Sequence, residues 1–379
     1  MSLSLVREDT VLSNHYRLEK DIEQWLKPFN LTLWIIFSNK YSIKNNYIAC
    51  KTRTATLVTS FCLSIGIIIS LYNNLHTNDP LSNIFSKFLS AAFVIEYHIG
   101  LVIVIIINIT HRRENISLIL MIQVIHKSIN IGKCFKSFII WNWILISILF
   151  FICFGFFATI YFSSNQVKFY DFFGDIIYMS FDLNLIHGIC ILTLLTKYLE
   201  EWTNSIIMPI NEPDGEEYYN KLCSTYKDIL KAYDLYKKTF HIVLLHYTCD
   251  TFLRVLFYIQ VSINTVKLKP HLRKTTVGAM FFVVLGWMVK NIIYLTINCI
   301  KSEKFYIMIE KTEDACLQLM KNSKCSRNQK HLCRVVLQAN RSFSKISACG
   351  LFYIDATLAI LFTEVLTGNI IVLLQFAFL

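Results

Sequence analysis

The amino-acid sequence predicts an all-α membrane protein with seven transmembrane helices. Apolar residues make up 54% of the 379 residues and charged residues only 17%, and the mean hydropathy is +0.47. Soluble domains are usually about 45–50% apolar and about 25% charged. The apolar excess is gathered in blocks of twenty or more residues, the length that a helix needs to cross a hydrocarbon core of roughly 30 Å.

Seven such blocks follow one another along the chain. They are 54–73, 88–110, 138–162, 172–196, 240–263, 276–300 and 357–379. All five prolines fall between these blocks, so none interrupts a predicted membrane helix. Charge precedes any apolar stretch in the opening MSLSLVREDT, so we expect no cleavable signal peptide.

The distribution of lysine and arginine predicts the orientation of these helices. The N-terminal segment and the second, fourth and sixth connections hold eight, five, six and ten of these residues, whereas the alternate connections hold one, one and four. Because positive residues favour the cytoplasm, we expect a cytoplasmic N-terminus and an extracellular C-terminus. The formal charge of +11 is therefore attributed to topology, and no nucleic-acid partner is expected.

This orientation is the reverse of that in a G-protein-coupled receptor, the main seven-helix alternative. None of the twelve cysteines lies in a predicted outer loop, so no extracellular disulfide can form there. The four N-x-S/T sequons fall on the predicted inner side or within a span; they begin at Asn30, Asn108, Asn115 and Asn340. Both observations favour the inverted topology.

The connections on the predicted cytoplasmic side are long and carry helical patterns. One apolar stripe leads into the fifth span and comprises Leu222, Tyr226, Ile229, Tyr233, Tyr236 and Phe240. A second pattern indicates another helix before the last span and comprises Leu332, Val336, Phe343 and Ile346. Near the N-terminus, one face suits a helix in the membrane interface and comprises Leu18, Ile22, Trp25, Leu26 and Phe29. We expect these helices to form a packed anchor domain, with separate surface helices as the alternative.

The last span carries a polar stripe. Glu364, Thr367 or Gly368, Ile371 and Gln375 recur at steps of three and four residues and therefore share one helical face. Such a stripe is expected to face water or partner helices. Around a symmetry axis, Glu364 would form a ring of carboxylates that favours cations, with Gln375 near the outer mouth. The alternative is that Glu364 snorkels inward or pairs with another span.

Polar residues in the other spans supply ligand-binding candidates, because a small-molecule ligand with hydroxyl or nitrogen groups needs hydrogen-bond partners against aromatic walls. These candidates are Asp175, Tyr178, Asp182, Tyr258, Gln260 and Trp287. Hydrogen bonding between helices is the alternative role for each of them. Asp250 and Arg254 are four residues apart and are predicted to form an ion pair within one helix. Lys290 is predicted to pair with a carboxylate on another span.

No pattern in the sequence points to an enzyme, a cofactor or a metal site. Cys316, Cys325 and Cys333, with His331, lack the C-x₂₋₄-C spacing of a zinc site. A phosphate loop, a nucleophile elbow and an H-E-x-x-H pattern are also missing.

The C-terminal sequence resembles that of the insect gustatory receptor family. The stretch ISACGLFYID (346–355) precedes the last span, which ends in five apolar residues (370–374) followed by Gln375 and Phe376. In that family a similar segment precedes a last helix that ends in Thr-Tyr, five apolar residues and Gln-Phe. Here the Thr-Tyr positions hold Gly368 and Asn369, and this difference leaves the subfamily open.

The resemblance implies a ligand-gated, non-selective cation channel in the plasma membrane of a chemosensory neuron. It implies a homo- or heterotetramer whose last helix lines a central pore, with Gln375 and Phe376 near the outer gate, and a small-molecule tastant such as a sugar or bitter compound. The expected parts are an N-terminal segment (1–53), a six-helix ligand-binding bundle (54–300), anchor helices (301–356) and a pore helix (357–379). The alternative is a transporter or orphan receptor without a central pore, although no internal repeat is visible.

Overall fold

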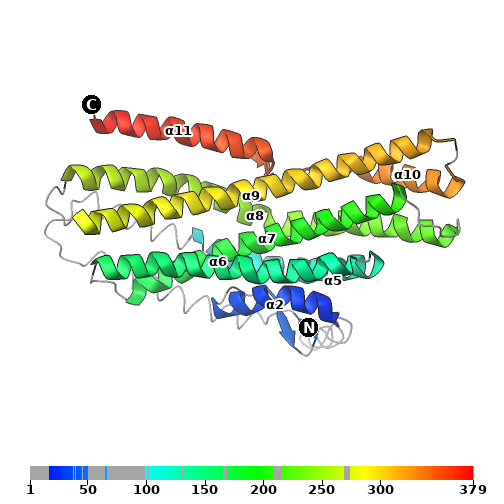
Figure 1. Ribbon diagram of the computed structural model, residues 1–379, viewed down its shortest axis with the longest axis horizontal. Coiled ribbons are helices and arrows are strands. Elements are labelled where there is room, and N and C mark those ends of the chain that lie inside the picture. The colour runs from blue at the N-terminus through cyan, green and yellow to red at the C-terminus, as the bar shows by residue number, and fades with distance from the viewer. Residues whose placement is uncertain are drawn as a thin grey trace, which may run out of the picture.

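The computed structural model of the chain shows long α-helices that run side by side (Figure 1). The structure describes residues 17–49 apart from 37, 39 and 45, residue 65, residues 99–164 apart from 101 and 130, and residues 169–207, 215–268 and 274–378 apart from 324. The predicted span 54–73 and the first part of 88–110 lie outside the described residues, apart from residue 65.

Five helices of the described part are long and apolar enough to cross a membrane. They are α6 (Gly132–Ser164), α7 (Phe169–Ile207), α8 (Glu216–Leu268), α9 (Lys274–Lys321) and α11 (Ala356–Phe378). They contain the last five of the seven predicted blocks, apart from residue 379, which lies outside the described residues. In Figure 1, α11 lies along one edge, next to α8 and α9. The chain is therefore an all-α, multi-pass membrane protein, as the hydropathy predicts.

Helices α8 and α9 are much longer than a membrane is thick. With 53 and 48 residues, they extend roughly 80 and 70 Å at about 1.5 Å per residue. The segments 216–239 and 301–321 therefore continue beyond the predicted spans. Helices α5 (Arg112–Ser128) and α10 (Arg327–Asn340) pack against α8, and α10 also packs against α9.

The predicted aromatic stripe forms the core of these extensions. The residues of the stripe from Tyr226 to Phe240 are buried, and Leu222 is partly buried. The ring of Tyr233 stacks on that of Phe305 from α9, with centroids 4.6 Å apart. On the same core, the ring centroid of Tyr226 lies 4.6 Å from that of Trp202 on α7. These contacts join three helices into one packed unit.

The N-terminal helix α2 (Lys20–Ile35) packs on the bundle and is followed by a short hairpin of β1 (Ser42–Lys44) and β2 (Tyr47–Ala49). The apolar face predicted to suit the membrane interface is instead buried against α6 and α7. Pro28 lies within α2 and removes one helical donor. Close to it, the Trp25 carbonyl accepts a hydrogen bond from Asn142 Nδ2 of α6 at 3.1 Å, which ties the helix to the bundle.

The helix predicted before the last span ends earlier than its apolar pattern indicates. Helix α10 contains Leu332 and Val336, both buried as predicted, but it ends at Asn340. The extension of this helix through Phe343 and Ile346 was therefore wrong. The ring of Phe343 packs into the aromatic core instead, and the chain continues into a second hairpin made of β3 (Ser347–Ala348) and β4 (Phe352–Tyr353).

Candidate functional site: a buried ion pair and the C-terminal helix

A buried ion pair joins α7 and α9 within the apolar part of the bundle. The Asp182 carboxylate pairs with the Lys290 ammonium, and the Tyr247 hydroxyl of α8 donates to Asp182 Oδ1 at 3.2 Å. All three residues are buried. Pairing neutralises two charges that would each be costly alone among apolar helices. The prediction that Lys290 pairs with a carboxylate on another span is confirmed, and the partner is Asp182.

Aromatic rings surround the Lys290 ammonium. Its Nζ lies 3.8 Å from the ring centroid of Trp287 and 5.7 Å from that of Tyr294, within the range of cation–π attraction. The ring of Phe156 on α6 lies 5.5 Å from that of Trp287. Two of the predicted ligand residues, Asp182 and Trp287, therefore meet in one cluster through Lys290.

Two of the other predicted ligand residues are not part of this cluster. Tyr258 and Gln260 are half-buried on α8, and Tyr258 lies eleven residues beyond Tyr247, roughly 16 Å along the helix axis. Asp175 and Tyr178 belong to α7, but their side chains lie outside the described part of the structure.

The predicted pair within α8 is confirmed. Arg254 Nε donates to Asp250 Oδ1 at 2.8 Å, and the side chains of both residues are at most 10% exposed. The pair lies between Tyr247 and Tyr258 on the same helix. The pair neutralises two charges within the span, so we assign both residues a structural role.

A second buried lysine, which the sequence did not single out, lies between α2 and the hairpin β1–β2. Lys40 is buried, and its Nζ lies 4.1 Å from the ring centroid of Phe240 on α8. Burial lowers the pKa of Lys40 to about 7. Nearby, both ring nitrogens of His187 on α7 lack a hydrogen-bond partner among the described residues. Lys40 stands in a loop without a helical or strand pattern, so no sequence signal reveals its burial.

A cavity of about 600 Å³ lies between α6, α7 and α9, next to the ion-paired cluster. Tyr294 belongs to both features, since it lines the cavity and its ring lies near the Lys290 ammonium. Of the predicted ligand residues whose side chains the structure describes, none lines this cavity; these are Asp182, Tyr258, Gln260 and Trp287. Sequence reasoning missed it because an unfilled space between three helices leaves no residue pattern.

Helix α11 contacts its own bundle through one narrow face. Phe362 and Leu366 are buried, and Leu358 and Ile370 are packed against the core one turn before and after them. The ring of Phe362 meets that of Phe252 on α8 edge-on, at 6.1 Å. Only 11% of the apolar stretch of this helix is buried inside the bundle.

The polar stripe of α11 lies on the opposite side and is exposed. Glu364, Gly368, Ile371 and Gln375 are all exposed, and their positions are about 180° around the helix from Phe362 and Leu366. Phe376 is 82% exposed but lies about 100° away from Gln375, so it flanks the stripe rather than continuing it. The stripe is thus available to neighbours outside this chain.

The hairpin β3–β4 connects the extensions to α11. Gly350 in its turn has φ +81°, in the left-handed region that glycine adopts at little cost. Asp355 then caps the N-terminus of α11, because its Oδ1 accepts hydrogen bonds from the backbone N–H of Thr357 at 3.1 Å and of Leu358 at 3.2 Å. Within ISACGLFYID, Gly350 therefore forms part of a turn and Asp355 forms a helix cap.

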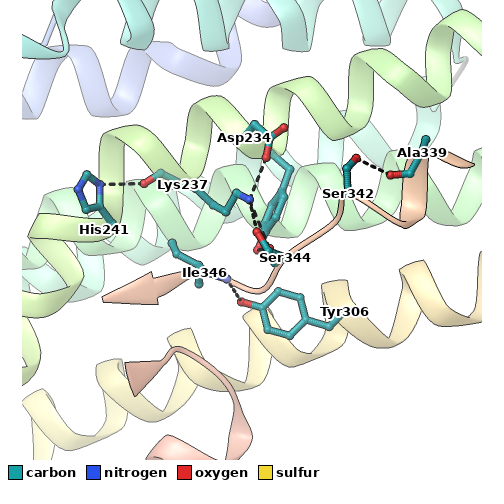
Figure 2. Close-up of polar contacts among 9 residues, drawn as sticks. Asp234, Lys237, His241, Tyr306, Ala339, Ser342, Ser344 and Ile346 are labelled. Atoms are coloured by element: carbon teal, nitrogen blue, oxygen red, sulfur yellow. Dashed lines mark hydrogen bonds and ion pairs between the residues drawn. The ribbon is translucent and has the colours of Figure 1, made fainter. Parts of the chain in front are cut away.

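Tyr306 of α9 binds the backbone at both ends of this hairpin, just before β3 and just after β4. Its hydroxyl accepts from the backbone N–H of Ile346 at 3.1 Å and donates to the Ile354 carbonyl at 3.0 Å. Figure 2 shows the bond to Ile346 and, beside it, Lys237 of α8 between Asp234 and Ser344. The start of α11 is thereby held by both long helices.

Replacing Tyr306 with phenylalanine is expected to lower the free energy of unfolding by about 1–3 kcal/mol, because a buried N–H and a buried carbonyl each lose their partner. Thermal unfolding of the detergent-solubilised full chain would measure the change. Tyr353→Phe is the matched control, since the Tyr353 side chain lies in the same hairpin and is 58% exposed. Equal melting temperatures for the two variants would contradict the role of the Tyr306 hydroxyl.

Together these features define a multi-pass helical membrane protein with long helical extensions and an apolar C-terminal helix at its edge. This fold is similar to that of the insect olfactory receptor OR5 from Machilis hrabei. One structure, in complex with eugenol, has a TM-score of 0.62, and a second structure of the same receptor has a TM-score of 0.58. Each is 12% identical in sequence and covers 93% of this chain and 98% of its own. Neither a family model nor a curated protein matches the sequence.

Proposed function

We propose that the chain is a subunit of a ligand-gated cation channel of the chemoreceptor type. The exposed stripe of α11 carries this proposal. Glu364 and Gln375 would face lipid in an isolated chain, where polar side chains are costly. Symmetric copies that turn α11 toward a common axis would remove both residues from lipid and line a path for water and cations.

Two further observations support a chemoreceptor. The fold is similar to that of an insect olfactory receptor, and the C-terminal sequence resembles that of insect gustatory receptors. We therefore propose a taste receptor that forms a homo- or heterotetramer in the plasma membrane of a chemosensory neuron. The proposal includes no enzymatic activity.

The proposed ligand is a small organic molecule. The similar olfactory receptor was solved in complex with eugenol, and the gustatory resemblance favours a sugar or bitter tastant for this chain. Asp182 and Trp287 meet in the bundle, and they supply a hydrogen-bonding group beside an aromatic wall. A ligand that reached this cluster would compete with the Asp182–Lys290 pair.

Currents in cells that express only this chain would test the proposal. A tastant panel that includes sugars, bitter compounds and eugenol is expected to evoke a cation current. In those cells, Gln375→Ala should change the single-channel conductance or the ion selectivity, because Gln375 would line the outer mouth of the pore.

Leu374→Ala provides the control, since Leu374 is also exposed and lies about 100° from Gln375 around the helix. An unchanged single-channel current in Gln375→Ala would remove that residue from the pore. Ligand binding without any current, alone or with a second receptor subunit, would favour a receptor or transporter without a central pore.

A further inference from the structure

The cavity between α6, α7 and α9 has an apolar interior and an open side. Its wall includes Phe138, Leu145, Ile186, Ile189 and Ile297. The volume of about 600 Å³ is in the range of small-molecule sites, roughly 300–1,000 Å³. Trp141 and Ile148 of α6 also line it and are 56% and 48% exposed. Because only 22% of the apolar stretch of α6 is buried, this side of the cavity would open to lipid.

Two lysines line the same cavity at one level of the bundle. Lys197 directly follows the predicted span 172–196, and Lys301 directly follows the predicted span 276–300. Both therefore stand where α7 and α9 leave the hydrocarbon. By the distribution of basic residues, this boundary is the cytoplasmic one.

The two lysines differ in what neutralises them. Lys197 binds two carboxylates, Glu200 at 3.1 Å and Glu201 at 2.8 Å. Lys301 is half-buried and makes no hydrogen bond or ion pair with another described residue. Lys304 lies three residues after Lys301 on α9, and Lys136 of α6 directly precedes the cavity-lining Ser137. Both are exposed and add positive charge at this boundary. The cavity therefore ends in a cationic rim with one unneutralised, half-buried ammonium.

We propose that this cavity binds an anionic phospholipid from the cytoplasmic leaflet. The apolar interior would take an acyl chain that enters past Trp141 and Ile148, and Lys301 would bind the phosphate, with Lys197 beside it. A neutral tastant would gain nothing from the basic rim, whereas an anionic lipid satisfies the apolar wall and the lysine together. Anionic lipids are also concentrated in that leaflet.

Native mass spectrometry of the full chain, released from nanodiscs of phosphatidylcholine with phosphatidylserine, would test the site. Removing one lysine near the membrane surface is worth about 1 kcal/mol of lipid attraction, so Lys301→Ala should weaken phosphatidylserine retention roughly fivefold. Lys311→Ala is the matched control. Lys311 is exposed on the same helix, ten residues and roughly 15 Å further from the membrane, and its loss should leave retention unchanged.

Two further experiments test whether the cavity itself is needed and whether the site prefers a lipid to a free anion. Thr193→Phe fills the cavity without changing charge and should also reduce retention, while Lys301 stays in place. Inorganic phosphate should not displace the lipid, and a diacylglycerol with the same acyl chains should bind more weakly than phosphatidylserine. Equal phosphatidylserine retention by Lys301→Ala, Thr193→Phe and Lys311→Ala would overturn the proposal, as would displacement by phosphate alone. Because the assay measures no current, its outcome is independent of the channel proposal.

Discussion

Replacing Asp182 with alanine is expected to lower the free energy of unfolding by about 3–5 kcal/mol, which is a large part of the stability of most proteins. The reason is that Lys290 is buried and would lose its carboxylate partner among apolar helices. The loss should appear as a sharp fall in the yield of monodisperse full chain and in its melting temperature in detergent.

A double substitution distinguishes the cost of an unpaired buried charge from the cost of the lost contact. In the double variant Asp182→Leu with Lys290→Met, neither charge of this pair remains, so most of the stability should return. Asp234→Ala is the control, because it breaks a pair with Lys237 in which the Asp234 side chain is 61% exposed, and such pairs are worth about 0–1 kcal/mol. An equally low melting temperature in the double variant would show that the charge itself is not the cause.

The same double variant distinguishes a structural role of Asp182 from ligand binding. If Asp182 serves only to neutralise Lys290, a folded double variant should still respond to the ligand. A folded double variant without a response would assign this cluster to the ligand pocket.

The two ion pairs show how far sequence reasoning reaches. Asp250 and Arg254 are four residues apart on one helix, so their contact follows from helical geometry alone. Asp182 and Lys290 are 108 residues apart. The cost of an unpaired lysine in a span predicts that a partner exists, but its identity depends on which helices are neighbours. That information lies in the packing of the whole bundle.

The segment before α11 shows a different limit. Phe343 and Ile346 continue the spacing of Leu332 and Val336, and this spacing fits a helix. The structure instead uses Phe343 in the aromatic core and Ile346 beside the hairpin. Local signals for this arrangement are present in Gly350, which suits a turn, and in Asp355, which precedes an apolar run as a cap does. The polar stripe of α11 was predictable because the spacing of residues along a single helix defines it.

Replacing Glu364 with lysine is expected to reduce the cation current by about an order of magnitude or more and to shift the reversal potential toward that of anions. In a symmetric channel the substitution would turn a ring of carboxylates into a ring of ammonium groups, and charge in a narrow path sets the local concentration of the permeant ion. Folding should be preserved, because Glu364 is exposed and makes no hydrogen bond or ion pair with another described residue.

Reversal potentials in asymmetric sodium chloride would measure this shift, and two variants bracket it. Glu364→Gln removes the charge at constant size and should fall between the parent and Glu364→Lys. Thr363→Lys places the same ammonium about 100° away on α11, outside the polar stripe, and should leave selectivity close to that of the parent. If Glu364→Lys and Thr363→Lys shift the reversal potential equally, the shift depends on the added charge and not on its position around the helix. Glu364 would then not face the conduction path, because only a stripe turned toward the symmetry axis distinguishes these two adjacent positions.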